Sequence, residues 1–166
     1  MIKRSLVTLS LLALLVPVAC KSSDKTAETT TTTTTTTTET TQAAMTPQEA
    51  IAAYKRGVDL SGKGQKDEAI AAYQTAIKGI PDFFEAQINL GMLQGENGQF
   101  DEAVASHRNA VRIKANDPWG HFHLGNSLKA KGEIDEAITE FKAAAKLAPN
   151  DSDVAAAVTS AEALKK

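Results

Sequence analysis

Acidic pairs that could do chemistry recur along this sequence, in the stretches GQKDEAI, GQFDEAV and GEIDEAI. Adjacent carboxylates such as Asp67 and Glu68 can act as an acid–base couple, bind a metal ion, or mark the start of a helix. Each pair follows a turn glycine, and the three copies begin at Gly64, Gly98 and Gly132, at a constant interval. Negative charge suits the free N–H groups at a helix N-terminus. Since one active site does not need its acids three times, the pairs indicate helix starts rather than catalysis.

The other reactive side chains form no catalytic or metal-binding pattern. His121 and His123 are two residues apart, about 200° around a helix axis, so they cannot bind one metal ion from one face. His107 stands where the other repeats have an aromatic residue and could approach His121 across a repeat junction, and we expect all three histidines to be structural. The sequence also lacks a nucleophile elbow, a zincin motif and a phosphate-binding loop. We therefore predict no enzyme activity, no cofactor and no metal, with an unrecognised catalytic or metal-carrier site as the less favoured alternative.

Composition and charge narrow the classes of partner. The 166 residues are 42% hydrophobic and 23% charged, which is typical of a globular protein, and the net charge is −2. The first 19 residues contain two basic and no acidic residues, so the remainder has 16 basic against 20 acidic, or −4. Phosphate binding requires a basic face. The sequence therefore predicts no nucleic-acid partner.

The N-terminus has the pattern of a secretory signal. Lys3 and Arg4 precede an uncharged, mostly apolar segment of about 14 residues, shorter than the ~20 needed to span a bilayer as a helix. Such a segment is typical of a cleaved signal peptide. The small residue Ala19 follows this segment and stands directly before Cys20, the only cysteine, so an intrachain disulfide is excluded.

This segment resembles the bacterial lipoprotein signal, on the residues Val18-Ala19-Cys20. The resemblance implies removal of residues 1–19 and attachment of acyl chains to Cys20, which would anchor the chain to a membrane. Pro17 departs from the leucine that is usual three positions before the cysteine. An ordinary signal peptide with an incidental cysteine is the alternative. Lys21 stands where an aspartate would favour inner-membrane retention, so we expect the bacterial envelope and favour the outer membrane.

Residues 20–45 predict a tether. Ten consecutive threonines run from Thr29 to Thr38, and the segment has almost no large apolar side chain. Such a composition cannot offset its ordering entropy by burial, and continuous β-branched residues disfavour a helix. We expect a disordered spacer spanning roughly 30 Å on average. The composition leaves open whether the threonines are glycosylated.

From residue 46 the spacing of apolar residues is helical and the 34-residue period indicates stacked units. The pattern resembles the tetratricopeptide repeat (TPR), with repeats at 50–83, 84–117 and 118–151. The shared positions are Gly57, Gly91 and Gly125; Ala69, Ala103 and Ala137; and Ala76, Ala110 and Ala144. The resemblance implies an all-α fold: an α-solenoid of three helix-turn-helix repeats over 46–151, followed by a capping helix over 152–166.

The repeats depart from the family at several places. His107 replaces an aromatic residue that Tyr73 and Phe141 supply in the other two repeats, and Ala115 replaces a proline. The usual tryptophan and tyrosine of the first helices are absent. Their places hold Ala53, Gln87 and His121, and Leu60, Gln94 and Leu128, respectively.

Capping residues mark the expected helix ends. Thr46 to Glu49 reads as a capping box with proline at the first helical position, and Asp117-Pro118 as a second N-cap. Asp82 with Glu85 has similar spacing and predicts a third. The expected capping helix carries a narrow apolar stripe, with two lysines at its end: Val154, Val158, Ala161 and Leu164, then Lys165 and Lys166.

In TPR domains the first helices of successive repeats line a concave groove, and the resemblance implies such a binding groove here. The frame places these residues in it: Ile51, Tyr54 and Val58; Glu85, Ile88, Asn89 and Met92; Trp119, Phe122, Asn126 and Lys129. Trp119 and Phe122 are candidate anchors, since large aromatics often dominate interfaces. The alternative is that several of these side chains pack between repeats.

The groove composition predicts the type of partner. TPR domains that hold chaperone C-terminal tails use a clamp of Lys, Asn and Arg, whereas Tyr54, Val58, Trp119 and His123 occupy the corresponding places. An apolar or amphipathic peptide, or a partner helix, fits better. The sequence therefore predicts a lipid-anchored envelope scaffold or adaptor that binds a protein or peptide, for example in envelope, pilus or secretion-complex assembly. Self-assembly into a homo-oligomer is the alternative.

Overall fold

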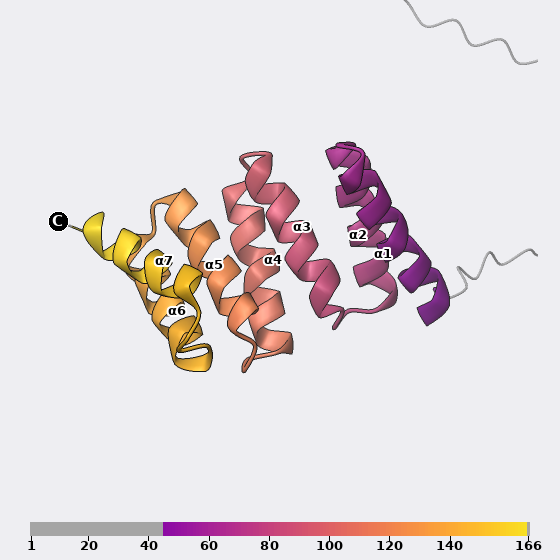
Figure 1. The fold of residues 1–166 in the computed structure, drawn as a ribbon. Coiled ribbons are helices and arrows are strands. Elements are labelled where there is room, and N and C mark those ends of the chain that lie inside the picture. Colours follow the sequence, from indigo (N-terminus) through magenta and orange to yellow (C-terminus); the bar gives the residue numbers. More distant parts are fainter. Residues whose placement is uncertain (1–44, 166) are drawn as a thin grey trace, which may run out of the picture. The chain divides into compact units, whose positions relative to one another are not determined.

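The computed structural model describes residues 45–165, which form seven α-helices and no strand in that range. Each helix contacts the next along the chain, so that helix pairs stand side by side in a row (Figure 1). The first helices of the pairs are α1, α3 and α5, the second helices are α2, α4 and α6, and α7 packs against α6. The helix bounds are α1 Pro47–Gly62, α2 Lys66–Gly79, α3 Phe84–Glu96, α4 Phe100–Ile113, α5 Pro118–Lys131, α6 Ile134–Leu147 and α7 Ser152–Ala163.

The turn inside each pair depends on a left-handed glycine. Gly64, Gly98 and Gly132 have φ values of +74°, +76° and +94°, where a side chain would be strained. Each glycine directly follows the end of the first helix or its cap, so the chain reverses within a short turn. The predicted role of these glycines is confirmed.

A second glycine in each pair makes room for a ring from the second helix. A Cβ built on Gly91 would lie 2.5 Å from the imidazole Nε2 of His107. Gly57 and Gly125 would clash in the same way, at 2.6 Å from the ring of Tyr73 and 2.7 Å from that of Phe141. These three rings are almost completely buried. The close helix approach expected from the sequence is therefore present, and the glycine meets an aromatic or imidazole ring at the same position of each second helix.

Helix starts follow the predicted caps with one exception. Thr46 and Glu49 form the capping box, and Asp117 accepts a hydrogen bond from the backbone N–H of Trp119. The prediction for Asp82 is wrong, because α3 begins one residue later, after Phe83, which has no side-chain cap. Asp82 instead accepts a hydrogen bond from Arg112 of α4 at 3.1 Å.

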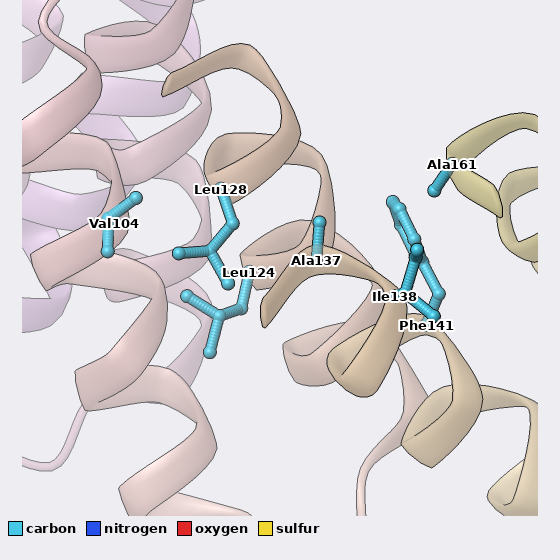
Figure 2. Packing of buried hydrophobic residues seen from close by; sticks show 7 residues of the cluster. All are labelled: Val104, Leu124, Leu128, Ala137, Ile138, Phe141 and Ala161. Carbon is cyan, nitrogen blue, oxygen red and sulfur yellow. The ribbon is translucent and has the colours of Figure 1, made fainter. Parts of the chain in front are cut away.

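The largest core cluster joins α4, α5, α6 and α7 (Figure 2). Leu128 and Phe141 are its most buried large side chains, and α7 adds Ala161. Val154 of α7 is also buried, but Leu164 follows the helix and is 60% exposed, so its predicted place in the apolar stripe is wrong. Within residues 45–165, no helix is long and apolar enough to cross a membrane.

Candidate functional site

The residues predicted for the groove lie on one face of the first helices. Tyr54, Ile88 and Phe122 occupy equivalent positions in α1, α3 and α5, as do Val58, Met92 and Asn126. Three hollows open on this face, and their walls include most of the predicted residues: Tyr54, Val58, Glu85, Ile88, Asn89, Met92, Trp119 and Asn126. We call these three hollows together the groove.

The largest of the three hollows, of about 320 Å³, lies between the N-terminal halves of the first helices. Tyr54 of α1, Ile88 of α3 and Trp119 of α5 contribute its apolar walls, with Phe84 beside them. Asn89 adds a carboxamide and donates a hydrogen bond to the Tyr54 hydroxyl at 3.3 Å. One concave, mostly apolar space is therefore built from three different helices, which is typical of a binding pocket.

Met92 is shared by all three hollows. The second hollow, of about 230 Å³, adjoins Val58 of α1, and the third, of about 250 Å³, adjoins Asn126 of α5. The Met92 side chain is 42% exposed. An unbranched thioether adapts its shape to what it contacts, so Met92 can adjust the boundaries between the hollows.

A chain of stacked rings leads from the groove surface into the core. Trp119, which is 52% exposed, stacks on His123 with a centroid separation of 5.9 Å. His123 in turn stacks on His107 at 5.5 Å. The imidazole that His107 meets is therefore His123, whereas His121 pairs with Glu140, whose carboxylate lies 2.7 Å from the His121 Nδ1. The sequence frame already placed His123 in the groove, one repeat after Asn89, but it did not predict the contact with His107.

His107 is a buried, neutral histidine. Its Nδ1 lies 2.8 Å from the Ser127 hydroxyl and its Nε2 lies 3.3 Å from the carbonyl oxygen of Ile88. Because a carbonyl oxygen only accepts, this arrangement has Nε2 donating and Nδ1 accepting from the hydroxyl. Burial lowers the pKa of His107 to about 4, and the neighbouring His123 contributes to this shift. Burial also lowers the pKa of His123.

The acidic residues of the groove are paired with lysines of the protein itself. Glu85 lies 2.9 Å from Lys114, whose hydrogen bond lowers the pKa of the Glu85 carboxyl. Glu96 lies 2.8 Å from Lys66. Both carboxylates are at the edges of the hollows. The apolar walls are therefore bordered by charges that already have partners.

Three predicted groove residues lie outside the hollows. Phe122 packs against the buried ring of Phe141 with a centroid separation of 5.9 Å, and its edge also meets Trp119. Lys129 places its ammonium 5.8 Å from the centroid of Phe141. Both side chains therefore stand on α5 and face Phe141 of α6. Ile51 is 40% exposed on α1 but also lies outside the hollows.

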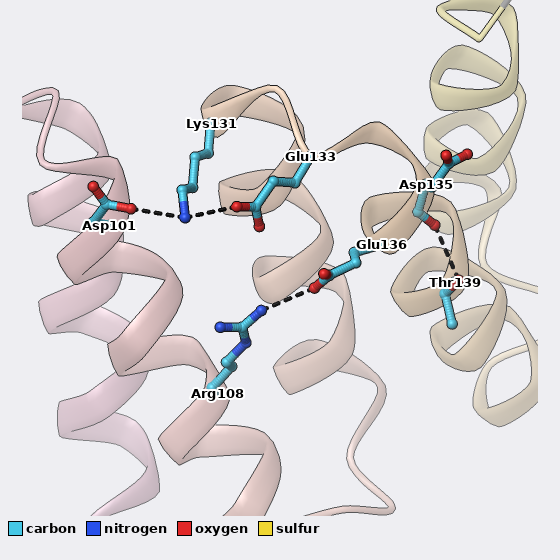
Figure 3. A network of polar contacts seen from close by, with 7 residues as sticks. All are labelled: Asp101, Arg108, Lys131, Glu133, Asp135, Glu136 and Thr139. Carbon is cyan, nitrogen blue, oxygen red and sulfur yellow. Dashed lines mark hydrogen bonds and ion pairs between the residues drawn. The ribbon is translucent and has the colours of Figure 1, made fainter.

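The repeated acidic pairs stand in the first turns of α2, α4 and α6, as predicted. The first two aspartates also contact the end of the first helix in the next repeat, and the third contacts a residue after α7. In all three cases the two partners are separated by the same number of residues. Asp101 binds Lys131 at 2.8 Å, and Lys131 also binds Glu133 (Figure 3). Asp135 binds Lys165 at 2.6 Å, and Asp67 accepts a hydrogen bond from Asn97 at 3.3 Å. The aspartates of the pairs therefore link each repeat to the part of the chain that packs after it, a role that the sequence did not reveal.

No group of three or more potential metal ligands occurs within residues 45–165. Cys20, the signal segment and the threonine run lie outside the described residues.

Comparison with known proteins identifies the family. Two family models described as "Tetratricopeptide repeat" match residues 54–118 and 95–161, and together they cover the three helix pairs almost completely. The chain belongs to the tetratricopeptide repeat family. No curated protein sequence matches it significantly.

Solved structures share the TPR fold at low sequence identity. The first TPR of Spaghetti (RPAP3) bound to the HSP90 peptide SRMEEVD superposes with a TM-score of 0.70 at 19% identity, covering 75% of this chain and 99% of that chain. The Yersinia enterocolitica type III secretion chaperone SycD, in complex with a peptide of the translocator YopD, gives 0.64 at 20% identity, covering 70% and 94%. MamA from Desulfovibrio magneticus RS-1 gives 0.66 at 18% identity, covering 70% and 66%.

Proposed function

We propose that this TPR protein is an adaptor that binds a segment of a partner protein in the groove. The observation that carries the proposal is the set of three hollows around Met92. An apolar cavity of about 150 Å³ is large enough to hold benzene. Each hollow, at about 230 to 320 Å³, therefore has room for one large apolar side chain. A face with three such spaces suits a polypeptide that presents several anchors, and binding rather than catalysis is the proposed activity.

The groove favours a partner segment with uncharged, apolar anchors. Its acidic groups, Glu85 and Glu96, already pair with lysines, so they offer little to a charged ligand. The RPAP3 domain was solved with a peptide that ends in EEVD. The resemblance to TPR domains that clamp chaperone tails places Tyr54 and Val58 where that clamp would have Lys, Asn or Arg. A segment of the apolar or amphipathic type therefore fits this groove better than an acidic chain end.

Polar groups at the groove edges would orient the bound segment. The carboxamides of Asn89 and Asn126 stand on α3 and α5, beside the apolar walls. A carboxamide both donates and accepts hydrogen bonds, which matches the groups of a peptide backbone. The Trp119 ring supplies a large exposed surface at the same edge, and tryptophan is a frequent source of binding energy at interfaces.

We propose further that the adaptor acts at the bacterial cell envelope. The resemblance of Val18-Ala19-Cys20 to a lipoprotein signal supports lipid attachment at Cys20, and residues 21–44 would separate the TPR domain from the lipid surface. Several acyl chains on one residue satisfy the requirement for stable membrane anchoring. Lys21 in place of an aspartate favours the outer membrane.

Co-purification from the native envelope tests the groove. The full chain, Met92→Ala, Trp119→Ala and Leu147→Ala are each recovered from solubilised membranes after crosslinking. Leu147 is 40% exposed, close to the 42% of Met92, but lies at the end of α6 outside the hollows, which makes it a matched control. Truncating an anchor at a groove hot spot costs roughly 1–2 kcal/mol or more, which is about five- to thirtyfold in affinity.

The proposal predicts specific partners that are recovered with the control and reduced with both groove variants. Equal recovery with all four chains would refute the groove as the binding surface. Recovery of nothing except further copies of this chain would favour self-assembly instead.

Metabolic labelling with a fatty-acid analogue tests the anchor. Label that is incorporated into the full chain and lost in Cys20→Ser supports lipidation, and density-gradient separation of the membranes then distinguishes the inner from the outer membrane. Unlabelled full chain recovered from the aqueous fraction would refute the anchor while leaving the groove proposal standing.

A further inference from the structure

A further hollow, of about 380 Å³, opens between α2, α3 and α4. We call it the α2–α4 crevice. Leu90 of α3 lines this crevice, whereas Met92 of the same helix lines the groove. Residues two apart on a helix point about 200° apart, so the crevice and the groove lie on opposite sides of α3. A ligand in the crevice would therefore leave the groove free.

The next junction of the array, between α4, α5 and α6, shows which side chains close such a space. There Arg108 of α4 forms an ion pair with Glu136 of α6 at 2.9 Å (Figure 3). In the same junction, the Nδ1 atom of His121 on α5 lies 2.7 Å from the carboxylate of Glu140 on α6. Side chains of α4 and α5 thus reach those of α6 and bridge the junction.

The α2–α4 crevice lies one repeat earlier, and there the first ion pair has lost its arginine. Gln74 stands at the place of Arg108, while Glu102 keeps the place of Glu136. Both Gln74 and Glu102 line the crevice, and Glu102 forms no ion pair with any residue between 45 and 165. The second pair is missing too, because a glutamine and a serine replace its histidine and its glutamate. The crevice is therefore open where the next junction is bridged.

The crevice combines a mostly apolar lining with one charge of each sign. Ile77 of α2, Leu90 of α3 and Ala105 of α4 contribute apolar surface from three helices. Lys78 lines the α2 wall, and among the described residues it has no ion-pair partner either. Lys78 is the thirteenth residue of α2 and Glu102 is the third of α4, two helices that run in the same direction. The two charges are therefore offset by about ten residues, or about 15 Å, along the helices.

We propose that the α2–α4 crevice docks an amphipathic helix of a partner protein, which carries a basic residue, an apolar anchor and an acidic residue along one face. The basic residue pairs with Glu102, as Arg108 pairs with Glu136 at the next junction. The anchor fills the space above Leu90, and the acidic residue meets Lys78. This surface is separate from the groove, so the proposal does not depend on what the groove binds.

The spacing of the two charges and the apolar lining both favour a helix. A residue about eleven positions further along a helix returns to the same face and lies about 16 Å along the axis, which matches the offset between Glu102 and Lys78. A helix also satisfies its own backbone hydrogen bonds, so that it can lay an apolar face on an apolar floor. An extended segment would place unpaired backbone groups over Ile77 and Leu90.

Selection of helical peptides on the full chain tests this proposal. A display library of peptides of about 18 residues, or five helical turns, is randomised on one face. Clones that bind Gln74→Arg are removed, and the rest are selected on the unmutated chain. Gln74→Arg places an arginine opposite Glu102, so it closes the crevice with a bridge that this fold already contains at the next junction. Binders of the groove are removed in the same step, because they do not distinguish the two chains.

The proposal predicts surviving clones that bind the unmutated chain at least about tenfold more tightly than Gln74→Arg, a difference of about 1.4 kcal/mol. These clones should share a basic and an acidic residue about eleven positions apart, with a large apolar residue between them. Survival of no clone, or of clones without the basic residue, would overturn the proposal. Denaturant unfolding of Gln74→Arg checks that the loss of binding is not a loss of structure.

A charge exchange tests the contact with Glu102 itself. Glu102→Lys should weaken the selected peptides about tenfold, because a like charge then faces their basic residue. Replacing that basic residue of the peptide by glutamate should restore binding to Glu102→Lys. Met92→Ala, on the opposite side of α3, should leave the affinity of these peptides unchanged. Equal binding to Glu102→Lys and to the unmutated chain would refute the pairing.

Discussion

Lowering the pH should destabilise this protein through His107. The imidazole is buried with a pKa of about 4, whereas an unfolded histidine has a pKa of about 6.5. Between these values the unfolded chain binds a proton that the folded chain does not, so stability rises with pH across this window and is lost as the pH falls. With these two pKa values, linkage gives a loss of about 2 kcal/mol between pH 7.5 and pH 5.

Denaturant unfolding of the full chain at pH 7.5, 6 and 5 measures this loss, with His107→Phe as the matched control. Phenylalanine resembles the rings of Tyr73 and Phe141 at the equivalent positions and does not titrate. The variant has its own baseline stability, because Ser127 and the Ile88 carbonyl lose their partner, so only the change with pH is compared. Between pH 7.5 and pH 5, the free energy of unfolding of the unmutated chain should fall by about 2 kcal/mol more than that of the variant. Equal losses in both would refute the assignment of a neutral, buried His107.

Three further substitutions test the packing and the repeat junctions by thermal or denaturant unfolding. Gly91→Ala forces a Cβ against the buried imidazole of His107 and should destabilise the protein by about 1–3 kcal/mol. Gly62→Ala has open space around it and should stabilise the protein by about 0.5 kcal/mol. An unchanged stability in Gly91→Ala would contradict the close contact with the ring. Thr46→Ala removes the capping box of α1 and should cost about 1 kcal/mol, and an unchanged midpoint would show that the cap is unimportant. Asn97→Lys places a lysine opposite Asp67, as Lys131 stands opposite Asp101. The free energy of unfolding should rise by up to about 1 kcal/mol at low salt. A gain that persists at high salt would contradict an ion pair.

The regular part of the fold could be predicted from the sequence because it depends on local rules. The repeat period, the turn glycines and the capping residues determine where helices begin and end, and the glycines at 57, 91 and 125 mark close helix contacts. The same period placed most of the groove residues on one face. The error at Asp82 arose because an aspartate and a glutamate at capping distance also suit ion pairs with the next helix, here with Arg112 and Lys114.

Contacts between repeats were harder to predict, because the sequence frame shows which face a residue occupies but not which side chain it meets. The pairing of Asp101 with Lys131 has a spacing shorter than the repeat period, which the frame does not reveal. His121 and His123 illustrate the same limit, since both stand on α5. Only the three-dimensional packing shows that His121 pairs with Glu140 and that His123 stacks on His107.

Binding of a partner segment in the groove around Met92 is tested most directly by the fluorescence of Trp119. Trp119 is the only tryptophan of the chain, is 52% exposed and lines the largest hollow of the groove. A peptide from the partner region identified by crosslinking is titrated into the full chain and into Met92→Ala and Leu147→Ala. We expect a saturable change in Trp119 emission, with an affinity that Met92→Ala weakens about five- to thirtyfold and Leu147→Ala leaves unchanged. Binding detected by another method without any change in Trp119 emission, or with equal affinity for Met92→Ala, would contradict it.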